Sequence, residues 1–141
     1  MMFLTETINA YFVEDVDKLR PLYAKDESKP VLAVDFDSTL SQLDAGKDFN
    51  SFYGTPIPGA QEWMQEMVQY FNIVIFTSRC LNYEGVKNIH AWLLRYDFPI
   101  NIFVTNVKIP ARYYIDDRAY RFTGNNYPSV EEVQNFTSWD K

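Results

Sequence analysis

The chain contains the stretch Val31-Leu-Ala-Val-Asp35-Phe-Asp37-Ser-Thr39, an apolar run of strand length that ends in two carboxylates. Residues two apart on a strand point to the same side, so both acids can face one small volume where the strand stops. Open α/β sheets bind their ligands at this carboxyl edge. No Lys or Arg stands beside the two acids in the sequence, so their repulsion needs a cation or a proton between them. The stretch therefore predicts a hard metal ion, a shifted pKa, or both.

The composition predicts one ordered globular unit with an acidic balance. The chain has 141 residues, of which 47% are hydrophobic and 17% aromatic. Its net charge of −6 argues against binding to an extended nucleic-acid duplex. The lone Cys80 cannot form an internal disulfide, and no apolar run has the length of a membrane span. With no secretory signal pattern at the N-terminus, we expect a cytoplasmic protein without a membrane partner.

Apolar periodicity predicts strands that alternate with helices. The expected strands are 31–35, 73–77, 102–104 and 113–115, and the expected helices are 11–23, 60–68, 83–96 and a short one after Ser129. Uninterrupted apolar strands suggest burial on both faces, which predicts an α/β fold: a three-layer, doubly wound parallel sheet. Residues 1–30 are expected to form an N-terminal helical extension, and residues 31–141 a second region without a large cap domain.

Each later strand also ends in polar side chains that suit phosphate chemistry. The second strand runs into Thr77-Ser78-Arg79, and hydroxyls beside exposed backbone amides can hydrogen-bond a phosphate oxygen. Lys108 lies shortly before the fourth strand, which closes with Asp116-Asp117. Because parallel strands end at one edge, these groups are expected to meet the first acidic pair there.

This ordered set resembles the haloacid dehalogenase (HAD) superfamily of phosphohydrolases that use an aspartate nucleophile. The family motif D-x-D-x-T matches Asp35-Phe-Asp37-Ser-Thr39, and the other three motifs match Thr77-Ser78, Lys108 and Ile115-Asp116-Asp117. The resemblance covers about residues 31–122, and the segment from Lys108 to Ala119 also looks like that of small, capless members. It implies a HAD-like Rossmannoid core in residues 31–141, the catalytic domain, and says nothing about residues 1–30.

The resemblance also implies a role for each matched residue. Asp35 would attack phosphorus and form an aspartyl-phosphate, while Asp37 would protonate the leaving oxygen and then take a proton from water. Mg²⁺ would be held by the Asp35 carboxylate, the Asp37 backbone carbonyl and Asp116, with Asp117 as a further ligand or holding a metal-bound water. The phosphate oxygens would be neutralised by Thr77, Ser78 and Lys108. Arg79 would help to bind the substrate or would be a surface charge.

The short intervals between motifs predict an open site. Only 18 residues separate Thr39 from Pro58, enough for a flap but not for a cap domain. An open site fits a large substrate, a macromolecular phosphate, or closure by a neighbouring subunit in a homo-oligomer. Further candidates for substrate contact are Asp44, Lys47, Asp48, Tyr53 and Tyr83.

These observations predict a Mg²⁺-dependent phosphomonoester hydrolase acting on a phosphorylated small molecule or macromolecular end. Within that class, a nucleotide or polynucleotide 3′-phosphatase competes with a sugar-phosphate phosphatase. A different kind of protein, a non-enzymatic HAD-like binding or regulatory module, is the other hypothesis.

Overall fold

The centre of the molecule is a four-stranded parallel sheet with the order β5-β4-β1-β6. The computed structural model describes residues 16–42 and 53–139. The strands are β1 (Val31–Val34), β4 (Asn72–Phe76), β5 (Phe103–Thr105) and β6 (Tyr113–Ile115). Their existence confirms the four predicted strands, with bounds that differ by at most one residue. The chain passes from β1 to β4 and β5 on one side and then crosses to β6 on the other side of β1. A sheet that reverses its order in this way opens a ligand crevice beyond the strand ends.

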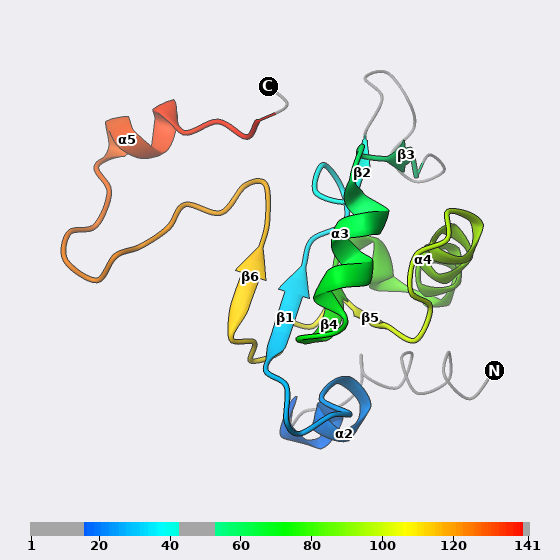
Figure 1. The fold of residues 1–141 in the computed structure, drawn as a ribbon. Coiled ribbons are helices and arrows are strands. Elements are labelled where there is room, and N and C mark those ends of the chain that lie inside the picture. Colours follow the sequence, from blue (N-terminus) through cyan, green and yellow to red (C-terminus); the bar gives the residue numbers. More distant parts are fainter. Residues whose placement is uncertain (1–15, 43–52, 140–141) are drawn as a thin grey trace.

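Two amphipathic helices cover one face of the sheet, and both lie where the sequence predicts a helix. They are α3 (Ala60–Met67) and α4 (Tyr83–Arg95), the second of which begins where the Asn82 side chain caps its first turn. Their buried side chains pack on the apolar residues of β1, β4 and β5 to form the larger core. Figure 1 shows both helices beside the strands, on the path from β1 to β5. The α/β class is therefore confirmed, and the sheet is compatible with a Rossmann-like core.

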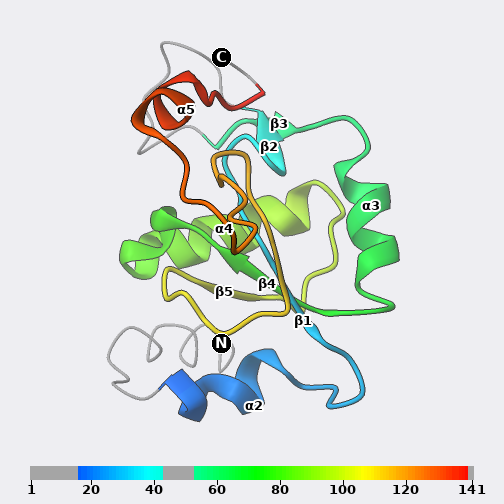
Figure 2. The same cartoon turned by 90° about the vertical axis from the view of Figure 1, so that its left-hand side faces the viewer.

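The opposite face is covered by the N-terminal segment. It consists of the 3-10 turn η2 (Val16–Leu19) and α2 (Arg20–Tyr23), and it packs Leu19 and Tyr23 against Val74 and Phe103. A continuous helix over 11–23 was wrong within the described part, because Pro21 lacks an N–H and starts a new helical turn. Residues 11–15 lie outside the described residues. In the view turned by 90°, α2 lies at the lower end of the sheet and the hairpin β2–β3 at the upper end (Figure 2).

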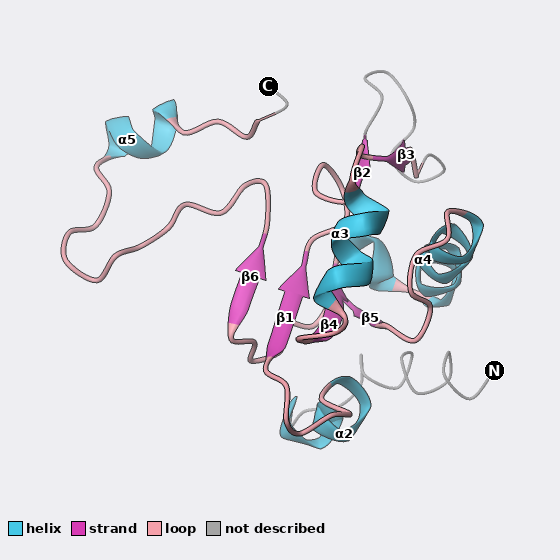
Figure 3. Ribbon diagram, viewed as in Figure 1, coloured by secondary structure: helices cyan, strands magenta, loops and turns pink. Residues whose placement is uncertain are grey.

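Strand β6 differs from the prediction of burial on both faces. Its three residues are each at least 40% exposed, because β6 is an edge strand. The chain then runs as a long loop to α5 (Val130–Asn135), drawn in Figure 3 without regular structure. The predicted capping box is confirmed, since the Ser129 hydroxyl accepts from the Glu132 amide and the Glu132 carboxylate accepts from the Ser129 amide.

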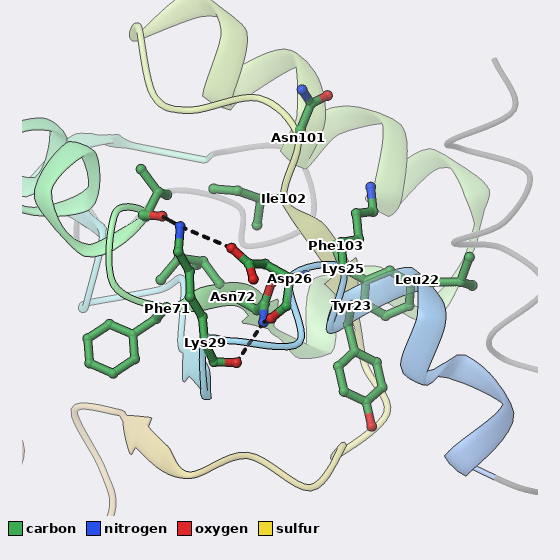
Figure 4. A pocket seen from close by; sticks show the side chains of 12 residues that line it. Leu22, Tyr23, Lys25, Asp26, Lys29, Phe71, Asn72, Asn101, Ile102 and Phe103 are labelled. Atoms are coloured by element: carbon green, nitrogen blue, oxygen red, sulfur yellow. Dashed lines mark hydrogen bonds and ion pairs between the residues drawn. The ribbon is translucent and has the colours of Figure 1, made fainter.

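Both edges of the sheet are hollowed, but with different chemistry. Above the carboxyl edge lie the short strands β2 (Ser41–Gln42) and β3 (Thr55–Pro56). At the amino edge a cavity of about 260 Å³ contains Asn72, whose amide donates to the carbonyls of Asp26 and Lys29 at 2.8 and 2.9 Å (Figure 4). These bonds tie the linker to β4, which gives this cavity a structural role.

Within the described residues, no helix has the length and apolar character needed to cross a membrane.

Candidate metal and phosphate site

The loop after β1 is wound tightly enough to fix both acids of the predicted motif. The Phe36 carbonyl accepts hydrogen bonds from the amides of Thr39, Leu40 and Ser41, at 2.9–3.3 Å. The Phe36 side chain is fully buried, with its ring 4.7 Å from that of Trp92, so the turn is anchored in the core. At the other end, the Asp35 amide donates to the Ile115 carbonyl and continues the sheet ladder. The carboxylates therefore project from a rigid position.

Three carboxylates meet at the carboxyl edge of the sheet. Asp35 follows β1, while Asp116 and Asp117 follow its neighbour β6, and one oxygen from each lies within 4.8 Å of the others. The Thr39 hydroxyl donates to Asp35 at 3.3 Å, and the Asp116 carboxylate accepts from the Arg118 amide at 2.8 Å. The parallel register that places Val34 opposite Ile115 is what brings these acids together.

The cluster is short of positive charge. Burial, a hydrogen bond shared with Asp117 and the charge of Asp116 raise the pKa of Asp35 to about 8. At neutral pH Asp35 without a cation nearby therefore retains a proton. The opening stretch of sequence predicted a shifted pKa from repulsion between Asp35 and Asp37, but the shift comes from burial and from Asp117 and Asp116.

The donor set fits a hard divalent cation. The Asp117 side chain is 4% exposed, and its buried Oδ2 atom has no hydrogen-bond donor among the described residues. The Arg118 guanidinium lies 3.7 Å away on a side chain that is 68% exposed, so solvent screens it. A buried, unsatisfied carboxylate oxygen facing two further carboxylates is the arrangement that Mg²⁺ or Ca²⁺ satisfies. Asp35, Asp116 and Asp117 would hold such an ion.

The carboxylate of Asp37 does not join the cluster. No Lys or Arg stands beside the two acids in the sequence, but the fold brings Arg79 next to Asp37. The Arg79 Nε atom lies 2.9 and 2.8 Å from its two oxygens, and Nη2 lies 2.8 Å from Oδ1. The Arg79 side chain is 2% exposed, which also excludes the surface-charge alternative. Its guanidinium carbon lies 4.3 Å from the centre of the Tyr53 ring, a cation–π contact. Asp37 and Arg79 thus neutralise each other beside the acidic cluster.

Six of the predicted site residues line one cavity of about 510 Å³: Asp35, Asp37, Thr77, Ser78, Asp116 and Asp117. The buried Thr77 caps the 3-10 turn η3 (Ser78–Leu81), its hydroxyl accepting from the Arg79 amide at 3.2 Å. Lys108 does not line this cavity; it is exposed, and its ammonium lies 5.2 Å from the Tyr114 ring centre. Asp44, Lys47 and Asp48 lie outside the described residues.

Family models, curated proteins and solved structures give no match to this chain. A function for this chain therefore has to be inferred from the geometry of the site.

Sequence reasoning missed one residue at this site. The Trp139 indole N–H donates to the Ser38 carbonyl at 2.6 Å, across 101 positions of sequence. Ser38 has a φ of 61°, in the left-handed region, and belongs to the same turn as Asp35 and Asp37. A single Trp in a polar C-terminal segment has no periodic neighbours, and no spacing rule could have placed it here.

Proposed function

We propose that the protein is a Mg²⁺-dependent phosphomonoester hydrolase that acts through a phosphorylated Asp35. The observation that carries this proposal is the cluster of Asp35, Asp116 and Asp117 at the carboxyl edge of a parallel sheet, with a buried carboxylate oxygen that no donor of residues 16–42 or 53–139 reaches. Mg²⁺ bound by these carboxylates would offset much of their negative charge, would attract the phosphate, and would displace the proton from Asp35.

The residues around the cluster support the chemistry in the following way. A carboxylate oxygen of Asp35 bonds to phosphorus as the bond to the leaving oxygen breaks, and water later cleaves the acyl phosphate, which releases phosphate and restores Asp35. Thr77 and Ser78 line the same cavity, where their hydroxyls would bind phosphate oxygens. Asp37, in the same cavity, is the group assigned to give and take the proton of the leaving oxygen and of water.

A hydrolysis assay on an aryl phosphate and a broad panel of phosphomonoesters tests the proposal. The wild type should release phosphate with Mg²⁺, and chelation should abolish the release. Asp35→Asn should reduce turnover to background while the protein stays folded, because the amide keeps the shape but is a poor nucleophile. Turnover by Asp35→Asn at the wild-type rate contradicts the role given to Asp35.

A non-enzymatic phosphate-binding module is the second candidate. The observation that favours it is the Arg79 guanidinium, which engages both oxygens of Asp37, the group that hydrolysis of an alkyl ester needs as an acid. Binding of Mg²⁺ and inorganic phosphate without turnover of any ester in the panel would support this candidate over the hydrolase.

A further inference from the structure

A second, apolar cavity adjoins the carboxylate cavity. It has a volume of about 340 Å³ and is bounded by Thr39, Ile57, Ile115 and Trp139. Ser38, Asp116 and Asp117 line both cavities, so the two lie side by side. A ligand with its phosphate at the acids would therefore place its leaving group against these apolar side chains.

Trp139 is held so that its ring surface stays available. The indole N–H is satisfied by the Ser38 carbonyl, and yet the side chain is 64% exposed. A hydrogen-bonded tryptophan fixed in orientation but left uncovered presents a flat aromatic surface at low entropic cost. Ile57 from the loop after β3 and Ile115 at the end of β6 supply the remaining apolar wall.

We propose that this cavity binds a planar aromatic ring carried by the leaving group of the phosphate ester. The inference rests on the proposed function, and it narrows the substrate class to aryl phosphates and nucleoside monophosphates. An acyclic aliphatic ester such as glycerol 2-phosphate has no aromatic ring to stack on Trp139 and would leave Ile57 and Ile115 facing water. The net charge of −6 also disfavours a long polyanionic substrate in favour of a small one.

Kinetics on three esters test the proposal: p-nitrophenyl phosphate, a purine nucleoside monophosphate and glycerol 2-phosphate, each with Mg²⁺. Trp139→Ala should raise KM for the two aromatic esters about 5- to 100-fold, the range of aromatic stacking, with a much smaller change for glycerol 2-phosphate. Trp139→Phe keeps a ring but loses the bond to Ser38, so it should retain most of the aromatic preference. Tyr127→Ala is the matched control, because Tyr127 is an 84% exposed aromatic of the same segment.

Several outcomes overturn the proposal. Equal losses on aromatic and aliphatic esters, or identical behaviour of the two Trp139 variants, would show that the bond to Ser38 matters and the ring does not. If Trp139→Ala raises KM for only one of the two aromatic esters, that ester shows whether the cavity prefers an aryl or a nucleoside leaving group. If the wild type hydrolyses none of the three esters, the proposed function fails. The proposed binding of an aromatic ring at Trp139 is then tested by measuring ligand affinity. Phenylphosphonate with Mg²⁺ should then bind the wild type at least about fivefold more tightly than Trp139→Ala, and equal affinity overturns it.

Discussion

At the scale of single residues, the site combines a cluster of three carboxylates with a buried ion pair between Asp37 and Arg79. Both side chains are at least 85% buried, and three donor–acceptor distances of 2.8–2.9 Å join them. Removing one partner of such a pair leaves an unpaired buried charge, which typically costs about 3–5 kcal/mol. Removing both costs less than the sum of the single losses.

A double-mutant cycle tests this coupling. Arg79→Met should lower the free energy of unfolding by about 3–5 kcal/mol, because the Asp37 carboxylate loses its counter-ion. Arg79→Met combined with Asp37→Asn should recover part of that loss, because the amide carries no charge. Urea unfolding of the wild type, both single variants and the double variant measures the coupling. Strictly additive losses contradict a direct interaction.

Asp37 makes a second prediction that separates catalysis from structure. Nitrophenolate leaves as a stable anion, whereas an alkoxide must be protonated as it leaves. Asp37→Asn should therefore lower kcat for glycerol 2-phosphate by about 10²–10⁴-fold and kcat for p-nitrophenyl phosphate far less. The ratio of the two kcat values is the measurement. Equal losses on both esters indicate that Asp37 only balances the charge of Arg79.

At the scale of elements, the contact between η3 and α4 determines where Arg79 lies. Gly85 in the first turn of α4 lies so close to the Arg79 carbonyl that an added Cβ would collide with it. Gly85→Ala must push η3 away from α4 and so disturb the pair between Arg79 and Asp37. We expect a loss of about 1–3 kcal/mol in stability from overpacking. Activity should fall by more than the unfolded fraction explains.

Circular dichroism melts and phosphate-release assays on Gly85→Ala measure both effects. Leu94→Ala is the control, since this α4 side chain is 66% exposed and should change stability by at most about 0.5 kcal/mol. An unchanged melting temperature and rate for Gly85→Ala would contradict the close packing of η3 on α4.

The N-terminal segment makes a similar prediction for the other face of the sheet. Leu19 is 2% exposed and belongs to the core that covers β4 and β5, so Leu19→Ala should cost about 2–5 kcal/mol of unfolding free energy. Leu81→Ala, at a position 73% exposed, is the control. Equal stability of the two variants in urea would mean that the N-terminal segment of η2 and α2 does not belong to the folded core.

The elements also show what the sequence can predict. The strands, α3 and α4 were predictable because β-branched runs and 3.6-residue spacing report burial directly, as in Ile73–Phe76 and around Ile89. The exposure of β6 could not be predicted, because an apolar triplet such as Tyr-Tyr-Ile has the same sequence pattern in an edge strand as in a central strand. The cover of the second face by α2 depends on packing between segments 50 or more residues apart, for which periodicity gives no information.

At the scale of the whole molecule, strand order explains which part of the site could be predicted. Asp35, Thr77 and Asp116 were placed together because parallel strands end at one edge, a rule that needs only their positions in the chain. The ion pair between Asp37 and Arg79 and the return of Trp139 to Ser38 depend on side-chain orientation and on a long loop. Neither follows from the spacing of residues.

The charge of the cluster predicts how pH and Mg²⁺ act on the stability of the whole protein. The raised pKa of Asp35, about 8 against an ordinary value of 3.8, means that the folded state keeps a proton that the unfolded chain releases. Stability without metal is therefore fully present below the unfolded pKa and falls as pH rises through the window from about 4 to about 8. Mg²⁺ competes with that proton, so its stabilising effect should grow over the same window.

Thermal melts at several pH values between 5 and 8, with a chelator and with Mg²⁺, measure both effects. Asp35→Asn mimics the protonated carboxyl, so without metal it should flatten the decline and melt above the wild type near pH 8. The same variant should lose most of the stabilisation by Mg²⁺, because one ligand is gone. Glu66→Gln, on the exposed side of α3, is the control and should follow the wild type. A wild-type melting temperature that rises with pH in chelator would contradict a proton-holding cluster at this edge of the sheet.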